Sequence, residues 1–183
     1  MSSGARSHTA PPPADRPPVS LPRLAEMKEK GEPIAMVTAY DFPSAKVAEE
    51  AGVDLVLVGD TAAMVVLGYS GTEPVSMEEM IVLGKAVRRG LKTALMIGDL
   101  PMGSYESSNE LAVLSAQRLI KETGAQTVKL EAGGVSAQRA KAIVVAISAG
   151  TASKTIAKQP ASCRAKASSY IRTAAFADLP WAL

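Results

Sequence analysis

The chain has 183 residues, of which 47% are apolar, and a formal net charge of +2. This composition excludes wholesale disorder and a fibrous repeat, and it provides a core for one domain. No apolar segment reaches the roughly 20 residues that cross a bilayer, and the N-terminus lacks the apolar centre of a secretory signal, so we expect a soluble cytoplasmic protein. Cys163 is the only cysteine, which excludes an intrachain disulfide and a cysteine zinc cluster.

The two ends of the chain differ in composition from its middle. Six prolines lie in the first 22 residues, a composition typical of a disordered leader. Residues 135–183 carry seven basic residues and one acid, and the basic residues are dispersed among Ala and Ser, which favours a solvated tail over a nucleic-acid patch. We therefore expect a leader at 1–22, a folded domain at 23–149 and a poorly ordered tail at 150–183. No nucleic acid or membrane partner is expected.

Helix and strand patterns alternate along the domain. Asp41 and Ser76 are predicted to begin helices, and Glu79 stands at capping-box spacing from Ser76. Gly31 and Gly52 mark helix ends. The predicted helices cover residues 21–31, 41–52, 76–90, 107–125 and 136–150, and the predicted strands cover 34–40, 53–60, 92–101 and 126–133.

The predicted strands are continuously apolar, which indicates a parallel sheet covered by helices on both faces. Such a sheet belongs either to an open doubly wound domain or to part of a (β/α)₈ barrel. Both architectures place function at the carboxyl ends of the strands.

An acid follows three of these strands: Asp60 in "VDLVLVGDT", Asp99 in "LMIGDL" and Glu131 in "VKLEAG". In either architecture the three carboxylates would converge, and a hard divalent cation such as Mg²⁺ would neutralise them. Lys129 lies on the same strand face as Glu131, because side chains alternate with period two. It would supply a positive charge for an anionic substrate.

Other interpretations of these residues stay open. An aspartate after a strand is often a helix cap or a turn former, which could apply to Asp60 before Thr61 and to Asp99 before Pro101. Lys129 could be a surface lysine with a buried stem. The pieces "GYSGT" and "EAGG" lack the spacing of a phosphate-binding fingerprint, so no nucleotide is expected.

The stretches "VTAYDFPSAKVAEEAGVDLVLVGDT", "LMIGDLPMGSY" and "VKLEAGG" resemble the ketopantoate hydroxymethyltransferase family, over about residues 22–134. The resemblance implies a (β/α)₈ TIM barrel of the phosphoenolpyruvate/pyruvate type with Mg²⁺ at the strand ends. By motif, Asp60 and Asp99 match metal-binding aspartates that also contact substrate, and Glu131 matches a third acid near the metal. Thr61 and Lys129 match substrate-binding positions.

The family reaction transfers a hydroxymethyl group from 5,10-methylenetetrahydrofolate to 3-methyl-2-oxobutanoate, giving 2-dehydropantoate, and family members form homo-oligomers. After Gly134 the resemblance fades, and the general-base glutamate of the family has no counterpart, since no acid lies between Glu131 and Asp178. A complete barrel needs about 250 residues. We therefore expect about the first half of the barrel, without catalytic competence. The alternatives are a non-catalytic binding or interaction module and another Mg²⁺-dependent, enolate-forming lyase of the same superfamily.

Overall fold

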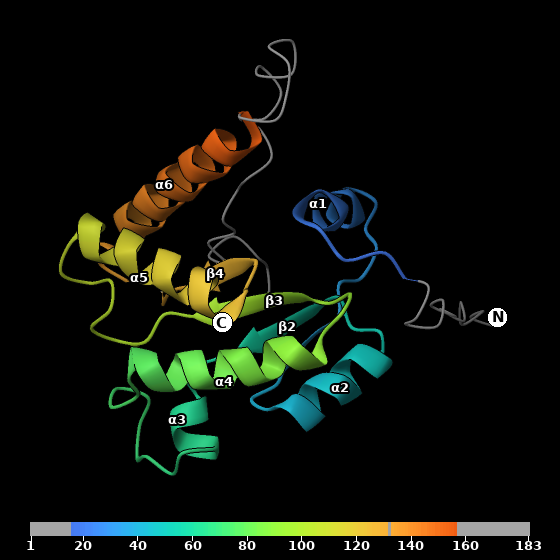
Figure 1. The fold of residues 1–183 in the computed structure, drawn as a ribbon, viewed down its shortest axis with the longest axis horizontal. Coiled ribbons are helices and arrows are strands. Elements are labelled where there is room, and N and C mark those ends of the chain that lie inside the picture. Colours follow the sequence, from blue (N-terminus) through green and yellow to red (C-terminus); the bar gives the residue numbers. More distant parts are fainter. Residues whose placement is uncertain (1–15, 132, 157–183) are drawn as a thin grey trace, which may run out of the picture.

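The computed structural model describes residues 16–131 and 133–156, so Cys163 and most of the predicted tail lie outside the described residues. The elements alternate along the chain from blue to orange in Figure 1. In chain order they are α1 (Leu21–Glu29), β1 (Met36–Thr38), α2 (Phe42–Glu50), β2 (Leu55–Val58), α3 (Ala62–Val65), α4 (Met77–Gly90), β3 (Leu95–Asp99), α5 (Asn109–Thr123), β4 (Thr127–Lys129) and α6 (Ser136–Ile156).

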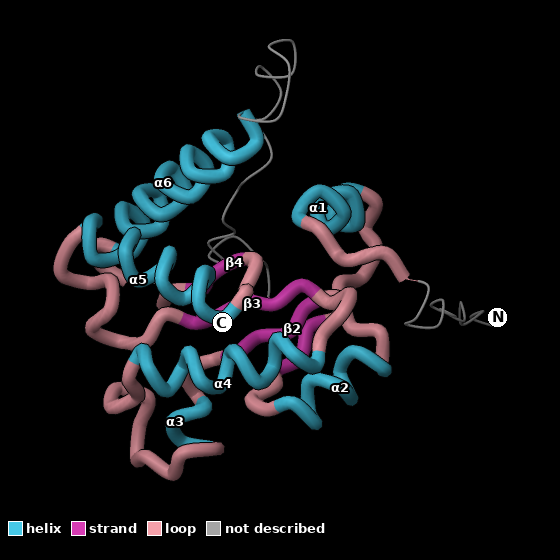
Figure 2. Tube along the Cα trace, viewed as in Figure 1, coloured by secondary structure: helices cyan, strands magenta, loops and turns pink. Residues whose placement is uncertain are grey.

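The four strands form one parallel sheet in the order β1-β2-β3-β4 (Figure 2). Each strand therefore pairs with the next one along the chain, and the order does not reverse as it does in a doubly wound sheet. Consecutive parallel order is the arrangement of a (β/α) barrel, of which the described strands are half. The sequence-based fold class is confirmed in this form.

Local capping fixes where the helices begin. Asp41 and Ser44 form a capping box at α2, and Ser76 and Glu79 form the predicted one at α4. At the other end of α5, Gly124 adopts the left-handed conformation with φ of 77°, which glycine adopts without strain.

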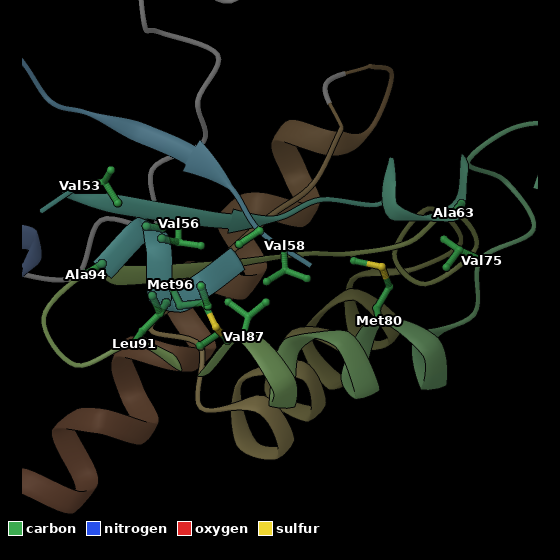
Figure 3. Close-up of a cluster of buried hydrophobic side chains, with 14 residues drawn as sticks. Val53, Val56, Val58, Ala63, Val75, Met80, Val87, Leu91, Ala94 and Met96 are labelled. Atoms are coloured by element: carbon green, nitrogen blue, oxygen red, sulfur yellow. The ribbon is translucent and has the colours of Figure 1, made fainter. Parts of the chain in front are cut away.

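Strands β2 and β3 are buried on both faces, as their continuous apolar runs predicted, whereas β1, at the edge of the sheet, is exposed at Val37 and Thr38. On one face Val56, Val58 and Met96 pack against Met80 and Val87 of α4 (Figure 3). On the other face a second cluster lies under α1, which Figure 1 shows across the sheet from α2 and α4. This second cluster consists of Val19, Leu55, Leu95 and Ile97, with Leu21, Leu24, Met36 and Leu57 packed against it.

The structure differs from the sequence-based elements at three places. Residues 16–20, which the prediction counted with the leader, contact the domain: Arg16 pairs with the buried Asp54, and the Val19 N–H donates to the Thr93 carbonyl at 2.8 Å. The one-turn helix α3 was not predicted. Helix α6 continues past Gly150, its predicted end, to Ile156. No helix in the described part of the chain is long and apolar enough to cross a membrane.

Candidate metal centre at the strand ends

Three carboxylates meet at the carboxyl edge of the sheet. Asp99 is the last residue of β3, Asp60 lies two residues beyond β2, and Glu131 lies two residues beyond β4. One oxygen from each side chain lies within 4.8 Å of the others. The three carboxylates therefore converge, as the predicted parallel sheet required.

Asp99 is the buried member of this group, with 1% of its surface exposed. Its Oδ2 accepts hydrogen bonds from the Lys129 ammonium at 2.8 Å and from the Asp60 N–H at 3.2 Å. Its Oδ1 is buried and has no hydrogen-bond partner. Burial raises the pKa of the Asp99 carboxyl to about 6, although Lys129 and the Asp60 N–H oppose the increase.

Lys129 lies inside the cluster. Its ammonium donates to both Asp99 and Glu131, and 24% of its side chain is exposed. Burial would lower the pKa of Lys129, but the charge and hydrogen bond of Asp99, with those of Glu131, outweigh burial and raise it. The surface-lysine interpretation is therefore wrong.

A divalent cation fits this donor set. Three carboxylates and one ammonium carry a formal charge of −2, and every carboxylate ligand is a hard oxygen donor. The unpartnered Oδ1 of Asp99 is a buried acceptor of the kind that a bound ion satisfies.

The helix-cap interpretation of the aspartates does not hold. The N-cap of α3 is Thr61, which is exposed and makes no side-chain capping bond. Asp99 ends its strand with a carboxylate that bonds to Asp60 and Lys129, across the sheet. Thr61 directly follows Asp60, at the start of α3.

Two residues that support the site were missed by sequence reasoning. The Tyr105 hydroxyl accepts the Glu131 N–H at 3.2 Å, and Arg139 of α6 donates to the Tyr105 carbonyl at 3.1 Å. The only sequence signal was the position of Tyr105 in "GDLPMGSY". Arg139 had been counted among the dispersed basic residues of the C-terminal region.

Solved structures share this fold. A 2,3-dimethylmalate lyase, a member of the PEP mutase/isocitrate lyase superfamily, superimposes with a TM-score of 0.53 and 17% identity, covering 69% of this chain and 47% of the lyase. A phosphoenolpyruvate phosphomutase from Streptomyces platensis subsp. rosaceus superimposes with a TM-score of 0.55 and 14% identity, covering 69% and 49%. The chain thus shares the TIM-barrel fold of these structures, over about half of the barrel.

The sequence places the chain more narrowly within these barrels. The family model described as ketopantoate hydroxymethyltransferase matches residues 18–151, and the chain belongs to this family of transferases. The match continues past Gly134, where the resemblance was expected to fade, and takes in most of α6.

Curated relatives agree with this assignment. The 3-methyl-2-oxobutanoate hydroxymethyltransferase of Moorella thermoacetica is 55% identical over 131 residues, which are 72% of this chain and 49% of that protein. The mitochondrial 3-methyl-2-oxobutanoate hydroxymethyltransferase 1 of Arabidopsis thaliana is 51% identical over 129 residues, which are 70% of this chain and 37% of that protein. The chain spans about half the length, or less, of the relatives it matches.

Proposed function

We propose that Asp60, Asp99 and Glu131 bind Mg²⁺ together with 3-methyl-2-oxobutanoate. The observation that carries the proposal is the convergence of three carboxylates, with one oxygen of each within 4.8 Å of the others, and one of them, Asp99, also has a buried, unpartnered oxygen. The names of the relatives supply the oxoacid. The family reaction would then be transfer of a hydroxymethyl group from 5,10-methylenetetrahydrofolate to this oxoacid, giving 2-dehydropantoate.

A bound Mg²⁺ would polarise the keto group of the oxoacid and acidify the carbon beside it. Lys129 would neutralise the carboxylate of the oxoacid, because its ammonium already lies between Asp99 and Glu131 and stays protonated. The hydroxyl of Thr61, next to Asp60, is exposed and available for a hydrogen bond to substrate.

The proposal assigns binding, and not turnover, to this chain by itself. Removal of a proton from the oxoacid needs a general base, and in the family this base is a glutamate. No acid lies between Glu131 and Asp178, and Lys129 is protonated and paired. We therefore expect the chain to bind the ion and the oxoacid without forming product.

Calorimetry with the purified full chain tests the binding. Wild type should bind 3-methyl-2-oxobutanoate only when Mg²⁺ is present, and Asp60→Ala should abolish this binding. Glu50→Gln is the matched control, because Glu50 is an exposed carboxylate on α2 that pairs with Lys46. Unchanged oxoacid binding by Asp60→Ala would contradict the site.

An assay with the oxoacid, Mg²⁺ and 5,10-methylenetetrahydrofolate tests turnover. Binding without 2-dehydropantoate formation is the expected result, and family-like activity would overturn the claim that a base is missing. Consumption of an oxoacid without the folate would instead indicate a lyase. The identity above 50% to hydroxymethyltransferases, against 14–21% to the solved structures that share the fold, favours the transferase reaction.

A further inference from the structure

The loop after β3 is tied to the end of β4 through Tyr105. The tyrosine ring is buried, with 5% of the residue exposed, in a cluster that includes Ile81, Leu100 and Ile143. Its hydroxyl accepts the Glu131 N–H at 3.2 Å. Packing around a buried ring fixes both side-chain torsions of the tyrosine. The hydroxyl is therefore a rigid hydrogen-bond acceptor for this backbone N–H.

Glu131 needs such a support. Strand β4 ends at Lys129, whose carbonyl accepts the Leu100 N–H at 2.9 Å, and Glu131 lies two residues farther on. The Glu131 side chain is 64% exposed, so surrounding packing does not fix it. Of the three carboxylates it is the exposed one, and it pairs with Lys129, whose side chain is itself partly exposed.

The loop that carries Tyr105 is itself held in place. Glu106 accepts the N–H groups of Gly103 and Tyr105, at 2.8 and 3.2 Å. Arg139 donates to the carbonyls of Tyr105 and Glu106, both at 3.1 Å. The position of the Tyr105 hydroxyl is therefore fixed from α6 as well as from the core.

We propose that Tyr105 is a positioning residue for the cation site: its hydroxyl holds the backbone of Glu131 so that the third carboxylate stays beside Asp60 and Asp99. This inference rests on the proposed function, since it assumes that the three carboxylates bind a cation. The loop that follows Asp99, the last residue of β3, thereby holds Glu131 through Tyr105.

Mn²⁺ binding to the full chain, measured by electron paramagnetic resonance of the free ion, tests the inference without any turnover. Tyr105→Phe keeps the ring and removes the acceptor, and it should weaken Mn²⁺ binding by about tenfold. Tyr69→Phe is the matched control, because its hydroxyl donates to Glu79 at 2.8 Å, outside the three carboxylates. It should leave Mn²⁺ binding unchanged.

A double-mutant cycle separates positioning from general damage to the fold. In a Glu131→Gln background, Tyr105→Phe should have no further effect on Mn²⁺ binding, because the carboxylate that it positions is gone. Arg139→Gln releases the same loop without removing the hydroxyl. It should likewise weaken Mn²⁺ binding when Glu131 is present and have no further effect in the Glu131→Gln background. Weakening of equal size in both backgrounds would overturn the inference.

The outcomes also separate the inference from the proposed function. Mn²⁺ binding by wild type that Tyr105→Phe leaves unchanged would refute the role of Tyr105 and leave the cation site standing. Absence of Mn²⁺ binding by wild type would refute the site, and the role of Tyr105 with it. If Tyr105→Phe weakens Mn²⁺ binding about tenfold only in chains that retain Glu131, the result would support both the cation site and the role of Tyr105.

Discussion

Replacing Asp99 by asparagine should change how the stability of the protein depends on pH. The pKa of Asp99 lies at about 6, against an ordinary value of 3.8, chiefly because the carboxyl is buried. One pKa unit corresponds to about 1.4 kcal/mol, so ionised Asp99 destabilises the ion-free fold by at most about 3 kcal/mol. Asparagine has nearly the same shape and cannot ionise.

The sign follows from which state binds the proton more tightly. Because the pKa is raised in the folded protein, the folded state holds the proton more tightly than the unfolded chain does. The contribution of Asp99 to stability is therefore fully present below pH 3.8 and is lost as the pH rises through 6. The free energy of unfolding of Asp99→Asn, relative to wild type, should rise by up to about 3 kcal/mol between pH 4 and pH 7.

Urea unfolding followed by circular dichroism, with a chelator present, measures this difference at each pH. Asp41→Asn is a control of opposite sign, because hydrogen bonds from the Ser44 hydroxyl and N–H lower the pKa of Asp41. Relative to wild type, the stability of Asp41→Asn should fall as the pH rises. A difference between Asp99→Asn and wild type that stays constant from pH 4 to pH 7 would refute the assignment of Asp99 as a buried, raised-pKa carboxyl.

Three further substitutions test packing, helix capping and a buried ion pair elsewhere in the fold by the free energy of unfolding. Gly90→Ala should destabilise by about 1–3 kcal/mol, because the new Cβ would lie 2.7 Å from the Cβ of Ala45; stability equal to wild type would contradict this contact between α2 and α4. Ser76→Ala removes the cap of α4 and should cost about 1 kcal/mol. Arg16→Ala leaves Asp54 buried without its partner and should cost about 3 kcal/mol; no loss would show that residues 16–20 are not docked.

Elements whose signals are local could be predicted from the sequence. The capping box of Ser76 and Glu79 lies within one helical turn, and the apolar runs of the strands are continuous, so both are visible in short windows. The single turn of α3 has no such signal, because four residues are too few to show a helical period. The contact between Arg16 and Asp54 joins residues 38 positions apart, which composition cannot reveal.

The candidate site also has features that the sequence predicts and features that it does not. Parallel strands bring their carboxyl ends to one edge, so the meeting of Asp60, Asp99 and Glu131 followed from the alternating pattern. The pattern could not show that Asp99 is the buried carboxylate, because burial depends on the helices that cover β3. Nor could it show the support from Tyr105, which is 26 positions from Glu131 in sequence.

The register of the sheet explains why an acid can stand at the end of a buried strand. Asp99 pairs with Lys129 across β3 and β4, so the two side chains share a face and their charges meet at 2.8 Å. The preceding Gly98 faces α5, where an added Cβ would lie 2.9 Å from Leu119. A slip of one residue would push the Asp99 side chain into that helix and Gly98 into the site. The same register therefore requires both the small residue and the acid in "IGDL", and the proposed cation site depends on the packing of α5 as well as on its own carboxylates.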